Sequence, residues 1–278
     1  MFESTVISAE QLKEAIDANS HLVIFDCRFN LMQPDEGAIN YKKAHINGAR
    51  YAHLDDNLSS AITARSGRHP LPEATQFANW LGEQGVDNET WIVAYDEQQN
   101  LIASRLWWLA RWIGHAKVVI LEGGLNDARA AGIEVNADPV FTLKSEFKIN
   151  PSLENYLGTQ DVETLDTTQY CLVDVRVATR FRGEFEPIDP VAGHIPGALN
   201  LPMDLALEAG KYRDKQALQT LFAHQLPSDK QPVFMCGSGV TACHTRLAHF
   251  ISGHATGSIY PGSWSEWIRD NKRAIATN

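Results

Sequence analysis

The sequence predicts an α/β protein built from two homologous domains, each a parallel sheet with helices on both faces. The chain has 278 residues, which is more than a single core usually supports. Its two halves repeat the same series of motifs, and within each half short apolar runs alternate with amphipathic segments. The repeat is far longer than that of a solenoid, so each half is expected to have its own core.

The internal repeat aligns the two halves motif by motif. Four pairs of segments occur in the same order: 22–28 with 171–176, 44–49 with 193–198, 91–96 with 231–236, and 121–124 with 259–262. His45 and His194 take equivalent places in this alignment, as do Asp26 and Asp174. Because the repeated histidines and aspartates occur in both halves, we interpret them as structural.

The elements of the first half follow from capping and periodicity. Ser8 is expected to cap the first helix, with Gln11 completing a capping box. The expected elements that follow are strand 22–26, helix 73–84, strand 91–95, helix 103–113 and strand 117–121. Strands that are apolar on both faces are typical of a parallel sheet covered on both sides.

A short stretch between the halves predicts the domain division. Residues 138–151 contain prolines near both ends and match neither repeat. We therefore predict a first domain at 1–137, an interdomain linker at 138–151 and a second domain at 152–278.

Composition and charge exclude several classes of function. The 24 Lys and Arg against 34 Asp and Glu give a net charge of −10, and no basic tract is present. This argues against binding to nucleic acid or to an anionic membrane surface. The N-terminus has neither a basic nor an apolar leader segment, so we expect a cytoplasmic protein. The four cysteines form no C-x-x-C pair and no metal-ligand cluster, so we expect no metal and no cofactor.

Cys236 is the candidate nucleophile. It follows an apolar, strand-like run and precedes Gly237, Ser238 and Gly239, after which a helix-like segment begins. A cysteine in such a strand-loop-helix junction lies among backbone N–H groups and near the positive end of a helix dipole, which favours the thiolate. The backbone from residue 237 to Val240 and Thr241 is expected to hold an anion, because the glycines allow close approach.

The first half lacks this nucleophile. Asp96 aligns with Cys236, and residues 97–100, Glu-Gln-Gln-Asn, replace the glycine-containing loop. A carboxylate there is expected to repel anions. We therefore predict one active site, with the first domain contributing a wall and not a second centre.

Together these motifs resemble the tandem-domain rhodaneses over essentially the whole chain. The resemblance rests on the repeated His-Ile-x-Gly-Ala signature, the loop 236–242 (Cys-Gly-Ser-Gly-Val-Thr-Ala), the segment 261–267 (Pro-Gly-Ser-Trp-Ser-Glu-Trp) and Asp96. The loop is similar to that of 3-mercaptopyruvate sulfurtransferases, whereas thiosulfate-type rhodaneses carry basic residues directly after the cysteine. Phosphatases of related fold need arginine at position 242, where this chain has Ala242.

The resemblance implies a sulfurtransferase. Cys236 would take sulfane sulfur from 3-mercaptopyruvate or a similar small anionic donor as a persulfide, and would pass it to cyanide, a thiol or thioredoxin. Arg180 would bind the donor, and Ser238, His69 and Asp55 would form a proton relay. The alternatives are a thiosulfate:cyanide sulfurtransferase and a sulfur-relay or persulfide-binding module with weak turnover on small donors.

One residue departs from the resemblance. The mercaptopyruvate enzymes have a second arginine in a Glu-Pro-Arg segment, but this chain has Glu186-Pro187-Ile188. The identity of the donor therefore stays open at this point. Farther along the chain, Cys243 is expected to be buried, and His244 and His249 are expected to face solvent.

Overall fold

The computed structural model describes residues 1–255 and 257–277. The chain divides into two compact units, the first made of Met1–Ser60 and Pro72–Leu153 and the second of Ala61–Leu71 and Glu154–Asn278. The second unit is thus discontinuous in sequence. Segment 138–151 contains no helix or strand and packs with the first unit, where the Ser145 N–H donates to Gly82 O at 2.8 Å. The domain boundaries at residues 137 and 152 stay a prediction.

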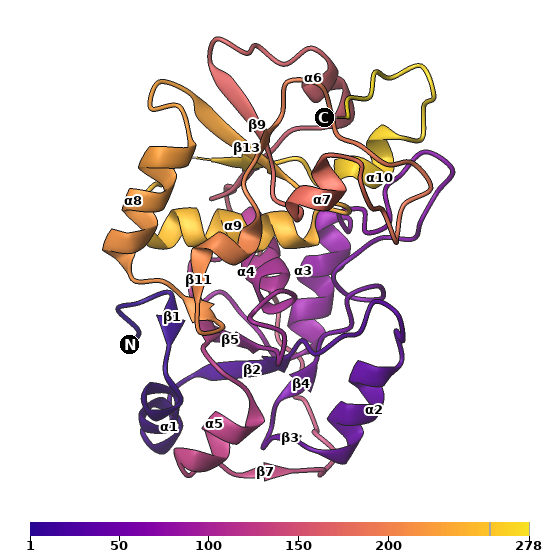
Figure 1. The fold of residues 1–278 in the computed structure, drawn as a ribbon. Coiled ribbons are helices and arrows are strands. Elements are labelled where there is room, and N and C mark those ends of the chain that lie inside the picture. The colour runs from indigo at the N-terminus through magenta and orange to yellow at the C-terminus, as the bar shows by residue number, and fades with distance from the viewer. Residues whose placement is uncertain (256, 278) are drawn as a thin grey trace. The chain divides into compact units, whose positions relative to one another are not determined.

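The first unit is built on a five-stranded parallel sheet (Figure 1). Across the sheet, the strands are β1 (Val6–Ile7), β6 (Val118–Leu121), β5 (Trp91–Tyr95), β2 (Leu22–Asp26) and β4 (Arg50–Tyr51). Strands 22–26 and 91–95 are confirmed residue for residue, and the strand expected from residue 117 begins at Val118.

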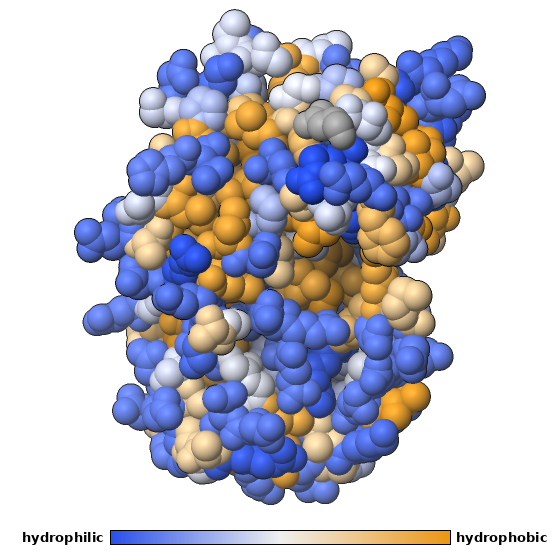
Figure 2. Space-filling model, in the orientation of Figure 1, coloured by the Kyte–Doolittle hydropathy of each residue, from blue (hydrophilic) through white to orange (hydrophobic). Residues whose placement is uncertain are grey.

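Helices cover both faces of this sheet (Figure 1). They are α1 (Ala9–Asp17), α2 (Glu36–Lys43), α3 (Ala74–Glu83), α4 (Ala103–Trp112) and α5 (Leu125–Ala130). The predicted capping box is present, because Ser8 Oγ accepts the Gln11 N–H while the Gln11 side chain accepts the Ser8 N–H. Helix α1 buries Leu12 against Ile24 and Val93, and Figure 2 shows a mainly hydrophilic surface over α1 and α5.

The second unit repeats this topology. Its parallel strands are β10 (Leu199–Asn200), β9 (Tyr170–Asp174), β13 (Gln231–Met235), β14 (Ser258–Ile259) and β8 (Asn155–Tyr156) in that order. Its helices are α6 (Thr159–Glu163), α7 (Ala178–Phe181), α8 (Lys215–Gln225), α9 (Val240–Ile251) and α10 (Ser263–Trp267), with a 3-10 turn at Met203–Ala206. When the strands are matched by the internal repeat, the two sheets have the same strand order. The predicted fold class is confirmed.

Short antiparallel pairs complete the two units. Strand β3 (His45–Ile46) pairs with β7 (Val135–Asn136), and β11 (Leu207–Glu208) pairs with β12 (Lys211–Tyr212). Within the described residues, no helix has the length and apolar character needed to cross a membrane.

Helix α9 is buried on nearly all sides. Cys243 is buried as expected, and its thiol donates to Gly239 O at 3.3 Å. The expectation that His244 and His249 face solvent is wrong. The His244 ring stacks on Tyr212, with centroids 4.5 Å apart, and the His249 ring contacts Phe222 of α8 at 4.9 Å. Helix α9 therefore packs against neighbouring elements on its outer side as well as against the sheet.

The repeated histidines make the same contacts in both units. His45 donates from Nδ1 to Tyr41 O at 2.8 Å and stacks on the Tyr41 ring. His194 donates from Nδ1 to Phe181 O at 2.8 Å and stacks on the Phe181 ring, with centroids 3.7 Å apart. Because the pair occurs in a unit without a nucleophile, the geometry supports a structural role.

A buried ion pair is repeated as closely. Arg28 binds Asp26 through Nε at 3.0 Å and Nη2 at 2.6 Å, and Arg176 binds Asp174 at the same two distances. Each arginine also donates to the chain just before the repeated histidine, to Ala44 O at 2.6 Å in one unit and to Gly193 O at 2.7 Å in the other. The pair thus ties the end of a sheet strand to the following turn.

His194→Ala is expected to lower the free energy of unfolding by about 1–3 kcal/mol, because it removes a buried hydrogen bond and a stacked ring. Urea unfolding of the second unit within the full chain measures this loss, with His224→Ala, at an exposed position of α8, as the control. A variant as stable as the control would contradict the structural role.

Candidate active site

Cys236 lies at the carboxyl end of β13, the central strand of the second sheet, and directly precedes the loop into α9. Its side chain is buried. The Cys236 N–H donates to Ser263 Oγ at 3.0 Å, and Sγ accepts the Gly239 N–H at 3.1 Å. The sulfur is therefore held by a backbone donor, which stabilises negative charge on it.

Gly239 is required by the shape of this loop. Its φ of +82° lies in the left-handed region, and a Cβ there would come within 2.2 Å of Pro261 O. Gly239 is also the N-cap of α9, so Val240 and Thr241 begin the helix. The first N–H groups of a helix have no intrahelical acceptor, which leaves them able to donate to an anion beside the sulfur.

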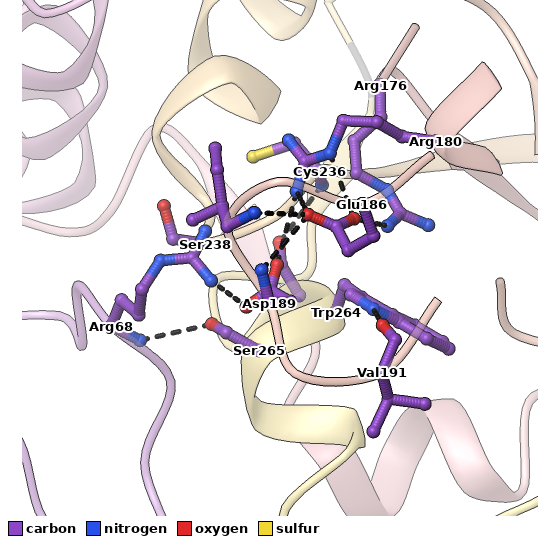
Figure 3. Close-up of polar contacts among 12 residues, drawn as sticks. Arg68, Arg176, Arg180, Glu186, Asp189, Val191, Cys236, Ser238, Trp264 and Ser265 are labelled. Atoms are coloured by element: carbon purple, nitrogen blue, oxygen red, sulfur yellow. Dashed lines mark hydrogen bonds and ion pairs between the residues drawn. The ribbon is translucent and has the colours of Figure 1, made fainter. Parts of the chain in front are cut away.

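Helix α10 connects this loop to segment 61–71. The Trp264 N–H donates to Cys236 O at 3.1 Å, and the Ser265 N–H donates to Gly237 O at 2.9 Å. Ser265 Oγ in turn accepts the Arg68 N–H at 3.1 Å (Figure 3). Glu266 accepts the Gly67 N–H at 3.2 Å. Segment 61–71, which has no helix or strand of its own, is thus attached directly beside the nucleophile.

This attachment brings His69 to Ser238. His69 Nδ1 and Ser238 Oγ are 2.8 Å apart, and both side chains are buried. Two members of the predicted relay are therefore in contact. Asp55 belongs to the first unit, is exposed, and donates its own N–H to His53 Nδ1 at 3.2 Å. Its place in the relay stays a prediction.

Arg180 lies beside the loop and is held by carboxylates. Its Nε and Nη2 bind the two oxygens of Glu186 at 2.9 and 2.7 Å, and Nη2 also lies 3.2 Å from Asp189 Oδ2. Ile188, where the second arginine was expected, is more than one-third exposed. The neighbouring Asp189 points inward and is buried, so this segment supplies a carboxylate to the site (Figure 3).

Arg68 is a residue of the site that the sequence analysis missed. Its guanidinium forms an ion pair with Asp189, which Arg180 shares (Figure 3). A Cβ added at Gly237 would lie 2.9 Å from Arg68 Nη2 and 3.5 Å from Arg180 Nη2. Both guanidinium groups therefore flank the residue that follows the nucleophile. The available signal was the position of Arg68 next to the candidate His69.

The equivalent loop of the first unit is filled by its own carboxylate. Asp96 accepts four backbone N–H groups, from Gln98 and Asn100 on Oδ1 and from Ile102 and Ala103 on Oδ2, all at 2.8–2.9 Å. Burial raises the pKa of the Asp96 carboxyl, while these N–H groups act in the opposite direction. The Asp96 carboxylate is expected to repel anions, and it also takes up the loop N–H groups that an anion would need as donors.

Two other cysteines lie in surroundings that disfavour the thiolate. Burial raises the pKa of the Cys27 thiol well above its usual value, and the carboxylates of Asp96 and Asp26 raise it further. Burial also raises the pKa of the Cys171 thiol. The Cys236 sulfur, in contrast, accepts the Gly239 N–H at the start of α9.

The comparison with known proteins finds the same domain family once in each half of the chain. Residues 8–131 and 154–270 each match the rhodanese-like domain family. The two matched segments cover most of the chain, and each contains most of one of the two five-stranded sheets.

Individual relatives match over nearly their whole length. The chain is 36% identical over 289 residues to a Pseudomonas aeruginosa protein named "Probable 3-mercaptopyruvate sulfurtransferase", covering 100% of this chain and 99% of the relative. It is 32% identical over 276 residues to the thiosulfate sulfurtransferase of Gallus gallus, covering 95% and 93%. The structure of a 3-mercaptopyruvate sulfotransferase from Escherichia coli superposes with a TM-score of 0.80 at 31% identity, covering 95% and 100%.

Iodoacetamide is expected to alkylate Cys236 before Cys27 and Cys171 in the folded protein, because the Gly239 N–H donates to the Cys236 sulfur whereas the pKa values of the Cys27 and Cys171 thiols are raised. Peptide mass spectrometry after short labelling at mildly alkaline pH measures the order. Cys236→Ser is the control and should remove the rapid phase. Equal labelling of all the cysteines would contradict this assignment.

Gly239→Ala is expected to destabilise the second unit by about 2 kcal/mol or more, because alanine must adopt a left-handed φ and also meets Pro261 O. It should also slow alkylation of Cys236, because the donor to the sulfur is displaced. Gly197→Ala offers a matched control, since Gly197 has the same φ of +82° with no atom near its Cβ position. Comparable alkylation in the two variants would sink the claim that Gly239 shapes the site.

Proposed function

Since the chain belongs to the tandem-domain rhodanese family of sulfurtransferases, we propose that Cys236 carries sulfane sulfur from 3-mercaptopyruvate or a similar anionic donor to a thiophilic acceptor. The observation that carries this proposal is the cradle of Cys236, whose sulfur accepts a backbone N–H at the start of α9. A thiolate in that position is both a nucleophile and a leaving group, as sulfur transfer requires.

The first half-reaction loads the enzyme. The Cys236 thiolate attacks the donor sulfur, an S–S bond forms, and the C–S bond of the donor breaks with its electrons going to the pyruvate enolate. The enolate then takes a proton to give pyruvate. In the second half-reaction, an acceptor thiolate attacks the outer sulfur, and the Cys236 thiolate leaves.

His69 and Ser238 are suited to supply that proton. Their contact of 2.8 Å allows the imidazole to pass a proton through the serine hydroxyl near neutral pH. Asp55 would complete the relay by orienting His69. The N–H groups from Gly237 to Thr241, together with Arg180, would hold the anionic parts of the donor and the persulfide.

Thiosulfate is the second candidate donor. It is favoured by the likeness to the Gallus gallus thiosulfate sulfurtransferase, but the neutral Gly237 and Ser238 lie where that enzyme type carries basic residues. The proposed acceptors are cyanide, a thiol or thioredoxin. All four cysteines are free thiols, which fits the proposed cytoplasmic location.

Incubation of the protein with 3-mercaptopyruvate, without acceptor, is expected to add the mass of one sulfur atom. Cys236→Ser should gain none, and a thiol acceptor should return the wild-type protein to its starting mass. Intact-mass spectrometry measures both steps, and steady-state kcat/KM for 3-mercaptopyruvate and thiosulfate ranks the donors. Failure of the wild-type protein to gain sulfur from either donor would refute the function. Loading only from a partner persulfide would favour the relay module.

A further inference from the structure

The arrangement of charges around Gly237 contains one cation that the proposed mechanism does not use. Arg68 comes from segment 61–71, far in sequence from Cys236 and Arg180, and its side chain is 21% exposed. Its backbone is fixed by the bond to Ser265, and its Nη2 lies 2.9 Å from the position that a Cβ at Gly237 would take. The structure therefore directs a positive charge to the residue directly after the nucleophile.

The donors of this guanidinium are only partly used. Arg68 pairs with Asp189 through Nη1. Its Nε is buried and has no acceptor within hydrogen-bond reach among residues 1–255 and 257–277. A buried N–H without an acceptor is costly, so such a group is a candidate for binding an oxygen ligand.

Arg180 presents a second set of donors to the same place. Its Nε and Nη2 are occupied by Glu186 and Asp189, whereas Nη1 lies 3.7 Å from the Cβ position of Gly237. Arg68 Nη2 lies 2.9 Å from that same position. The two guanidinium groups are joined by the Asp189 carboxylate, which shows that one carboxylate can bind both at once.

This pairing also explains two departures from the sequence pattern. A basic side chain at position 237 would place a third cation against Arg68 and Arg180, so the neutral glycine fits the site. Ile188 leaves the second arginine missing from its usual segment, but Arg68 brings a guanidinium to the loop from another part of the chain.

We propose that Arg68 is the second donor-binding arginine of this enzyme and that, together with Arg180, it binds the carboxylate of a carboxylate-bearing sulfur donor. The inference rests on the proposed sulfurtransferase function. Asp189 bridges the two guanidinium groups in the structure. Because a guanidinium presents a planar fork, two of them can bind both carboxylate oxygens and orient the adjacent sulfur toward Cys236.

Steady-state kinetics of Arg68→Gln with two donors tests this role. With 3-mercaptopyruvate, KM is expected to rise roughly 10- to 100-fold, the effect of losing one hydrogen bond between charged groups. With cysteamine persulfide, which has no carboxylate, kcat/KM should stay within about 2-fold of wild type, since only the contact to the carboxylate is lost. Arg68→Lys should recover part of the loss, because it keeps the charge without the fork.

Arg182→Gln is the matched control, because Arg182 is 40% exposed and pairs with Glu184 outside the loop. It should leave both donors unaffected. An unchanged KM for 3-mercaptopyruvate in Arg68→Gln would overturn the inference, and so would an equal loss with both donors, which would assign Arg68 to the sulfur or to folding. If wild type gains no sulfur from either donor, the proposed function itself fails, and that outcome is distinct from the other two.

Discussion

The central strand of each sheet ends in a loop whose backbone donates to the side chain at the end of that strand, and the rest of the structure depends on this interaction. In the first unit the loop surrounds the Asp96 carboxylate with four N–H donors. In the second unit the same position holds Cys236, whose sulfur accepts the Gly239 N–H. The two units therefore use the same strand-loop junction differently, one around the Asp96 carboxylate and one around the Cys236 thiol. The difference between a scaffold and a catalyst is here a single residue and the glycines that follow it.

The arginines near the thiol come from different places in the sequence, and each forms an ion pair with a nearby carboxylate. Arg176 is committed to Asp174 and Arg180 to Glu186, while Asp189 joins Arg180 to Arg68. Each buried guanidinium is thereby neutralised, which limits the cost of removing it from water. The same carboxylates fix the direction of the Arg68 and Arg180 forks, which both lie beside Gly237. Two arginines can then flank the loop in a protein whose net charge is strongly negative.

Much of the fold could be predicted from the sequence, because the repeat and the apolar runs are local signals. Strands 22–26 and 91–95, the Ser8 cap and the position of Cys236 follow from patterns within a few residues. Ser238 and His69 were paired only through a family resemblance. The contacts of Arg68 with Asp189 and Ser265 could not be predicted, since they join residues more than a hundred positions apart through loops without periodicity. His244 and His249 were misjudged because packing over the outer side of α9 is a tertiary effect.

Segment 61–71 is part of the second unit although it lies within the sequence of the first half. After a gene duplication, an unused copy is normally free to decay. Here the half that has Asp96 in place of the cysteine still encodes the segment with Arg68 and His69, so removing that half would also remove these two residues from the second unit. The second unit therefore needs residues that both halves of the sequence encode. A shortened gene encoding only the later half would produce a rhodanese-like domain that retains Cys236 but lacks Arg68 and His69.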